Sequence, residues 1–122
     1  MPVPADWKIK SSAWFQKLQD LLIGAFEAIE DEGRDGKASS RFERRPWRRE
    51  GGGGGTMAML RGSVLEKAGV NVSTVEGVFS EQFRHQIPGA SDDPRFWASG
   101  ISVVAHPRSP LVPAAHMNTR MI

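Results

Sequence analysis

The sequence has 122 residues, of which 39% are hydrophobic and 25% charged, and its formal net charge is +2. These values are typical of one globular domain, and the small net charge does not by itself indicate a polyanionic partner. No apolar stretch approaches the roughly 18 residues of a membrane span and no secretory signal is present, so we expect a cytoplasmic protein. The absence of cysteine excludes disulfides, thiolate metal sites and thiol nucleophiles.

The first predicted element is an amphipathic helix. Apolar residues recur at steps of three and four residues from Trp14 to Ile29. We expect Ser11 or Ser12 to be its N-cap and the helix to end near Gly33. The following residues, GRDGKASS, are typical of a loop.

An arginine-rich segment follows, in which five of the eleven arginines lie within nine residues. We expect Arg41 to Arg49 to form a strand, and Pro46 favours an edge position or a non-pairing site. The arginines can be a solvated strand edge. Alternatively, because Trp47 lies among them, they can bind single-stranded nucleic acid, although no second aromatic platform accompanies them.

Five consecutive glycines then occur in the segment WRREGGGGGTM. They do not match the phosphate-loop pattern GxxxxGK[ST], because Thr56 and Met57 follow them. As a linker they would join two units that are too small to fold alone. We therefore expect a sharp turn or a close backbone approach that tolerates no Cβ.

The central part of the chain predicts a mixture of short elements. MAML, after the glycines, is expected to be a short strand, and Ser63 with Glu66 matches a capping box for a short helix that ends at Gly69. The β-branched residues of the next segment favour another strand: Val70, Val72, Val75 and Val78. IPGASDDPR is typical of turns. The pattern indicates an α+β fold with a mainly antiparallel sheet.

The last part of the chain predicts two strands, Ser99 to His106 and Ala114 to Ile122, joined by PRSPLVP. Side chains alternate between the two faces of a strand. If the strands pair antiparallel, their polar residues share one face: Ser102, His106, His116, Asn118 and Arg120. The apolar residues share the other: Ile101, Val103, Ala105, Met117 and Met121.

This polar face has the chemistry to bind a carboxylic acid. Arg120 can bind a carboxylate bidentately, Asn118 and Ser102 can orient it, and either His106 or His116 can transfer a proton near neutral pH. The alternative is a solvated outer face, which is the usual state of an antiparallel sheet.

A metal site is a further alternative for the two histidines. His106 and His116 can act as ligands, but without a nearby carboxylate they fall short of the three protein ligands of a usual catalytic zinc. We expect His85, in FRHQIP, to be a loop or surface residue.

Three segments in order resemble the oxygen-dependent coproporphyrinogen III oxidases: WRREGGGGGTM, GSVLEKAGVNVS and SGISVVAHPRSPLVPAAHMNTR. The resemblance extends from about Phe42 to the last residue. It implies a haem-pathway enzyme that uses dioxygen to decarboxylate two propionates of coproporphyrinogen III to vinyl groups, giving protoporphyrinogen IX. It also implies a large, mainly antiparallel sheet flanked by helices, a homodimer, no organic cofactor, no nucleic-acid partner and no membrane span.

The resemblance also assigns roles to individual residues. It implies that Ser102, Asn118, Thr119 and Arg120 contact the substrate and that His116 is the catalytic proton donor. His106 and His116 match positions proposed as ligands of a divalent metal. Trp47 and the glycine turn are expected to border the macrocycle.

The family pattern continues beyond the last strand of this sequence, to an Asp-Leu-Thr-Pro segment whose aspartate engages the pyrrole nitrogens. Residues 1–122 are therefore expected to be the N-terminal part of a single coproporphyrinogen III oxidase domain, inactive alone. A non-catalytic porphyrin-binding fragment and a basic nucleic-acid-binding module are the alternatives.

Overall fold

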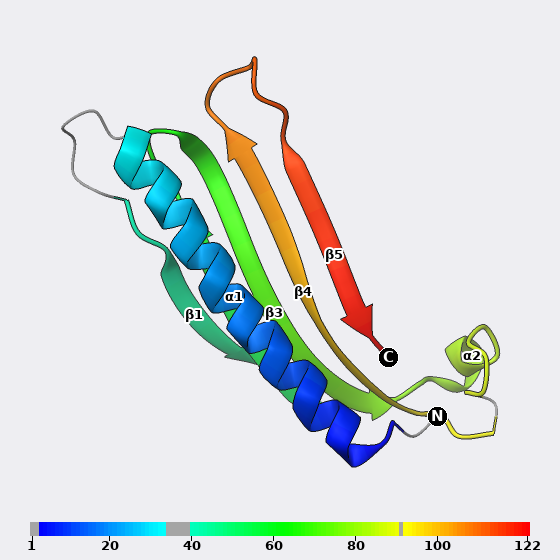
Figure 1. Cartoon of the computed structure of the whole chain (residues 1–122). Helices are drawn as coiled ribbons and strands as arrows, with labels where there is room; N and C mark the ends of the chain where they lie inside the picture. Colours follow the sequence, from blue (N-terminus) through cyan, green and yellow to red (C-terminus); the bar gives the residue numbers. More distant parts are fainter. Residues whose placement is uncertain (1–2, 34–39, 91) are drawn as a thin grey trace.

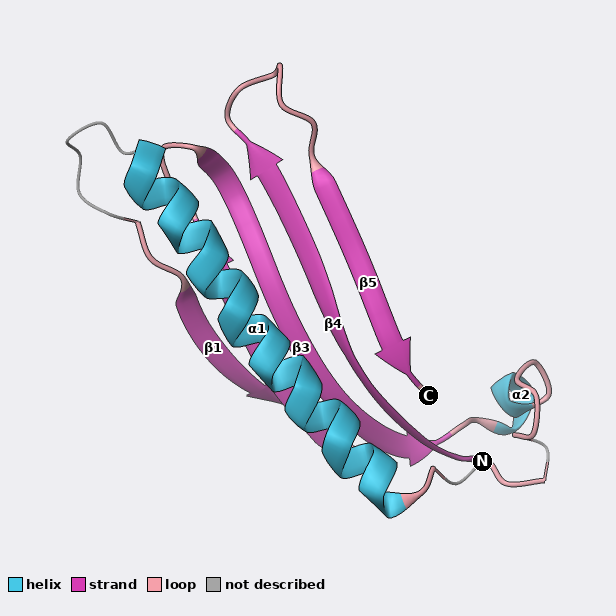
Figure 2. Ribbon diagram, in the orientation of Figure 1, coloured by secondary structure: helices cyan, strands magenta, loops and turns pink. Residues whose placement is uncertain are grey.

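The computed structural model describes residues 3–33, 40–90 and 92–122. A long helix, α1 (Ala5–Gly33), lies along one face of a five-stranded antiparallel sheet (Figure 1). The strands follow each other in chain order: β1 (Glu43–Arg48), β2 (Gly53–Leu60), β3 (Leu65–Val78), β4 (Arg95–Pro107) and β5 (Ala115–Met121). A one-turn helix, α2 (Glu81–Arg84), lies in the connection between β3 and β4 (Figure 2). The predicted α+β class with an antiparallel sheet is confirmed.

Helix α1 begins earlier than the sequence pattern predicts. The prediction that Ser11 or Ser12 is the N-cap is wrong, because both residues lie inside the helix. Their hydroxyls donate to carbonyl oxygens one turn earlier, Ser11 to Trp7 and Ser12 to Lys8, each at 2.7 Å. A serine hydroxyl can form this bond within a helix as well as cap its end. The predicted end at Gly33 is confirmed, and most of the predicted loop lies outside the described residues.

The hydrophobic core lies between α1 and the sheet. One cluster joins Phe15 and Ile23 of the helix to buried residues of three strands: Ala58, Val70, Val72, Ile101 and Val103. A second cluster lies near the other end: Leu60, Leu65, Ala68 and Ala105. Phe26 and Phe42 pack against both clusters. Because strand side chains alternate, the residues between these core positions lie on the sheet face opposite α1.

Strand β1 is an edge strand, as the proline predicted, with Pro46 opposite Thr56 of β2. The glycine run forms both a turn and the start of β2. Gly51, Gly52 and Gly53 have φ of 98°, 136° and 87°, a region that side chains disfavour, and the N–H of Arg49 donates to the carbonyl of Gly53 at 2.9 Å. The expected turn with close backbone approach is confirmed.

The predicted capping box at Ser63 is wrong, because no helix forms there and β3 begins at Leu65. The backbone N–H groups of this segment are bound by a distant residue instead. The carboxylate of Glu30, on α1, accepts from Ser63 and Val64 at 2.9 Å and from Leu65 at 2.6 Å. Glu30, which the tertiary fold brings close, thus binds the N–H groups that the sequence pattern assigned to a local capping box with Glu66. The segment forms no helix, and β3 pairs with β4 instead.

The two C-terminal strands form and pair antiparallel as predicted, with Val103 opposite Met117.

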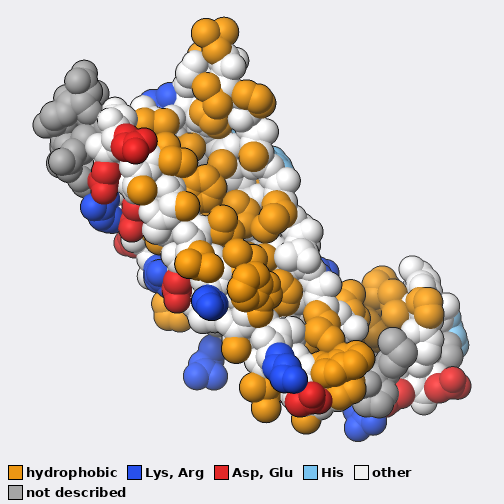
Figure 3. All heavy atoms as spheres, in the orientation of Figure 1, with side chains coloured by type: hydrophobic (Ala, Val, Ile, Leu, Met, Phe, Trp, Pro, Cys, Tyr) orange, Lys and Arg blue, Asp and Glu red, His pale blue; other side chains and the backbone are white. Residues whose placement is uncertain are grey.

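Hydrophobic side chains are exposed on the face of the molecule that carries α1 (Figure 3). The exposed residues of α1 include Trp7, Trp14 and Leu21. No helix in the described part of the chain is both long and apolar enough to cross a membrane.

Candidate functional site

The sheet face opposite α1 carries rows of side chains that run across the strands. Strand pairing places one row in the order Trp47, Gly55, Ser73, Gly100 and Arg120, one residue from each strand. The neighbouring row contains Asn71, Ser102 and Asn118. Because adjacent strands lie about 4.8 Å apart, the first row extends about 19 Å from Trp47 to Arg120.

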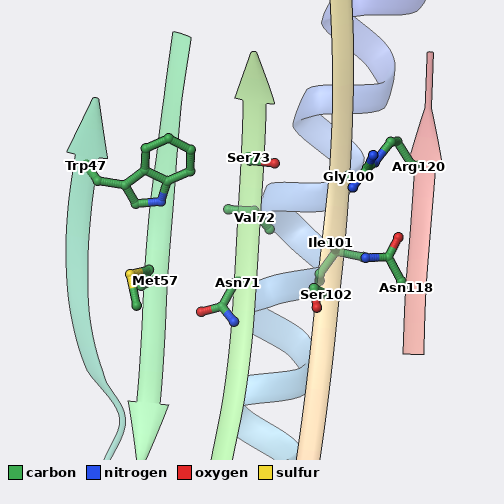
Figure 4. A pocket seen from close by; sticks show the side chains of 10 residues that line it. All are labelled: Trp47, Met57, Asn71, Val72, Ser73, Gly100, Ile101, Ser102, Asn118 and Arg120. Atoms are coloured by element: carbon green, nitrogen blue, oxygen red, sulfur yellow. The ribbon is translucent and has the colours of Figure 1, made fainter. Parts of the chain in front are cut away.

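A hollow of about 290 Å3 lies over these two rows (Figure 4). Gly55 and Gly100 place no side chain in the row between Trp47 and Arg120, so only Ser73 does. A Cβ at Gly55 would lie 3.0 Å from Cζ2 of Trp47, and one at Gly100 would lie 3.4 Å from Cβ of Arg120. Met57 adds an apolar wall beside Trp47. The hollow therefore has an aromatic and apolar end on β1 and β2 and a polar end on β4 and β5.

The structure brings together three of the predicted site residues in this hollow. Ser102, Asn118 and Arg120 all line it, and Ser102 is directly opposite Asn118 in the strand pairing. Thr119 is separated from them. It pairs with Ile101, and strand alternation places its side chain on the face that carries α1.

The two histidines lie on the same face but outside the lining of the hollow. Nε2 of His106 is 2.7 Å from Nε2 of His116, and the rings are stacked with centroids 5.0 Å apart. His116 is two residues from Asn118, which is about 7 Å along a strand. The predicted single polar face is therefore confirmed, and the two hydrogen-bonded imidazoles lie at one end of it.

The donor set does not fit a metal centre within the described residues. Among them, no group of three or more histidine, cysteine or acidic side chains could hold a metal ion. Two imidazoles on a tetrahedral zinc, with Zn–N of 2.0–2.1 Å, would have nitrogens about 3.3 Å apart. The observed 2.7 Å is the distance of a hydrogen bond that shares one proton.

Most of the arginine-rich segment is bound to other groups of the chain. Arg41 is bound by Asp31 at 2.9 Å, and Arg44 by Asp20 at 2.7 Å. Arg49 donates to the carbonyl of Glu76 at 2.9 Å and lies over the ring of Phe96. These contacts support a structural role for the segment more than a nucleic-acid interface.

Sequence reasoning missed the contribution of β3 to the hollow. Asn71 and Ser73 line it, and both alternate with the core valines Val70 and Val72. This polar–apolar alternation is the signal in the sequence that identifies the face, whereas the β-branched residues alone predict only a strand. His85 follows α2 and is exposed, as expected.

Comparison with known proteins gives consistent matches. The coproporphyrinogen III oxidase family matches residues 10–122. The chain is 53% identical over 114 residues to the oxygen-dependent coproporphyrinogen-III oxidase of Rickettsia africae (strain ESF-5), covering 92% of this chain and 41% of that protein. The proteins of the same name from Rickettsia bellii (strain OSU 85-389) and Rickettsia felis (strain ATCC VR-1525 / URRWXCal2) are 53% and 54% identical over the same shares. The chain thus spans about two fifths of the length of these relatives.

Proposed function

Because this chain belongs to the oxygen-dependent coproporphyrinogen III oxidase family, we propose that its sheet face binds coproporphyrinogen III for oxidative decarboxylation to protoporphyrinogen IX. The observation that carries the proposal is the hollow, in which Arg120, Asn118 and Ser102 lie across from Trp47 and Met57. A porphyrinogen is an apolar macrocycle with carboxylates on its rim, so it needs both kinds of surface.

The reaction assigned to the site converts two propionates to vinyl groups. In each conversion the side chain loses CO2 from its carboxylate and a hydride from the carbon attached to the ring. The hydride and one proton reduce dioxygen, the co-substrate, to hydrogen peroxide.

The residues of the chain have separate parts in this proposal. Arg120 holds a carboxylate by charge-assisted hydrogen bonds, while Ser102 and Asn118 fix its orientation. His116, hydrogen-bonded to His106, donates the proton. No step is assigned to a metal. The proposal also includes assembly of the complete enzyme as a homodimer.

Binding of coproporphyrin III, the oxidised and stable form of the substrate, tests the proposal. We expect it to quench the fluorescence of the chain, because Trp47 borders the hollow. Arg120→Ala should weaken binding about 10- to 100-fold, the effect of one charge-assisted contact.

The matched control is Arg44→Ala, which removes the same charge from a residue bound to Asp20, on the α1 side of the sheet. It should change the affinity by less than about twofold, because it lies away from the hollow. Equal losses in both variants would reject the assigned role of Arg120, and no binding by the unchanged chain would reject the proposed function.

A further inference from the structure

The pairing between β2 and β3 is interrupted beside the hollow. It runs from Gly53 to Thr56 and resumes at Met59, which faces Gly69. The two pairs between them, which would join Met57 to Asn71 and Ala58 to Val70, are missing. Backbone groups at such a break need other partners, because unpaired buried groups are costly.

One side chain fills the break from the side of α1. Gln19 is fully buried, and its Nε2 donates to the carbonyls of Thr56 and Val70 at 3.1 and 3.0 Å. Its Oε1 accepts from Nε2 of Gln16 at 2.9 Å. Gln19 thereby satisfies two carbonyl groups that the interrupted ladder leaves open.

A second side chain fills the break from the side of the hollow. Oδ1 of Asn71 accepts a hydrogen bond from the N–H of Ala58 at 3.2 Å. An N–H group can only donate, so the atom of Asn71 that faces Ala58 must be the oxygen. The amino group is therefore turned away from Ala58, on the sheet face that carries the hollow (Figure 4).

The break thus gives the hollow a donor with a fixed orientation. Asn71, Ser102 and Asn118 lie in one row, about 4.8 Å apart from strand to strand. Arg120 is in the next row, two strands from Asn71, which places their Cα atoms about 12 Å apart. A macrocycle with several carboxylates can therefore place different carboxylates at Asn71 and at Arg120.

We propose that Asn71 is a substrate-binding residue whose Nδ2 donates to a carboxylate of the substrate other than the one held by Arg120. This rests on the proposed function for the identity of the substrate. The hydrogen bond to Ala58 prevents the amide group of Asn71 from rotating by 180°, so Asn71 itself presents its Nδ2 donor to the hollow and not its oxygen. Asn71 then fixes the rotation of the macrocycle relative to Arg120.

The variant that tests this is Asn71→Asp. It keeps an oxygen for the N–H of Ala58 and removes the Nδ2 donors. We expect the melting temperature to remain within about 2 °C of the unchanged chain and the affinity for coproporphyrin III to fall at least about tenfold. Gln82→Glu, an exposed amide-to-acid change on α2, is the control and should leave the affinity unchanged.

Affinities measured at high salt distinguish the loss of the Nδ2 donor in Asn71→Asp from repulsion between its new charge and the substrate. At 1 M salt the screening length is about 3 Å, so repulsion between the new charge and carboxylates held farther away, such as the one at Arg120, is largely removed. The tenfold deficit of Asn71→Asp relative to the unchanged chain should persist there. Disappearance of the deficit, or an unchanged affinity at low salt, would overturn the proposal.

A second probe makes the result independent of the proposed function. Sodium propionate should shift the side-chain amide NMR signals of Asn71 in the unchanged chain. If propionate shifts them while coproporphyrin III does not bind, the carboxylate site stands and the proposed function fails. If coproporphyrin III binds and neither probe shifts the amide signals of Asn71, the role of Asn71 fails and the proposed function stands. If coproporphyrin III does not bind and propionate shifts no amide signal, both proposals fail.

Discussion

Nε2 of His106 and Nε2 of His116 share a hydrogen bond of 2.7 Å across the end of the polar sheet face. One ring must donate and the other must accept, so the two imidazoles cannot both carry a proton on Nε2. The hydrogen bond therefore holds one proton between the two Nε2 atoms, and it links two strands that pair directly.

The buried carboxylate of Glu30 should be important for stability. Glu30→Gln removes charge from a group that is 1% exposed and leaves a single amide oxygen for three backbone N–H groups, so an amino group faces at least one of them. We expect the free energy of unfolding to fall by about 3 kcal/mol, as measured by urea denaturation. The control Glu32→Gln, exposed on the same helix, should change it by less than about 0.5 kcal/mol.

Two glycine substitutions should have opposite effects. A Cβ at Gly55 would meet the carbonyl of Val72 and Cζ2 of Trp47, so Gly55→Ala should lower the melting temperature and disturb the hollow. A Cβ at Gly24 meets nothing within 4 Å, and Gly24→Ala should stabilise α1 by about 0.5–1 kcal/mol. Calorimetry of both variants tests this, and equal shifts would show that close packing does not explain the glycine run.

Stability should depend on pH through Asp93. Hydrogen bonds from the side chain and the backbone of Arg95 lower the pKa of the Asp93 carboxyl well below its usual value. A carboxyl with a lower pKa in the folded state stabilises the fold above its unfolded pKa, about 3.9, and that contribution is lost as the pH falls further. The difference in melting temperature between the unchanged chain and Asp93→Asn should therefore shrink below about pH 4. A difference independent of pH would contradict this linkage.

If the sheet face binds coproporphyrinogen III as proposed, the 122 residues by themselves should bind it without converting it. The side chains of His116, Asn118 and Arg120 are exposed, so water reaches the site from the open side of the sheet. Water weakens the electrostatic contacts that a decarboxylation site needs. Aerobic incubation followed by protoporphyrin fluorescence measures turnover, and a rate equal to that of the complete Rickettsia africae protein would contradict the expectation.

The two-residue alternation of polar and apolar side chains predicted the parts of the fold that depend only on neighbouring residues. The alternation around Ser102 and Asn118 gave the correct face, because the antiparallel pairing of two adjacent strands requires only a short connection. The region near Ser63 failed, because its backbone partner, Glu30, is 33 residues away in the sequence. The interruption of the β2–β3 pairing, filled by Gln19 and Asn71, could not be predicted from local sequence, because nothing in the sequence distinguishes these amides from other polar residues.

The continuous pairing of β4 also limits how the gene can change in length. Ser102 faces the hollow while Ile101 and Val103 face α1, so one inserted codon before Ser102 would exchange the two sets for the strand beyond it. A single insertion would then remove apolar side chains from the core and polar side chains from the hollow together. Substitutions can alter this face one side chain at a time, whereas insertions and deletions are tolerable only in the connections between strands.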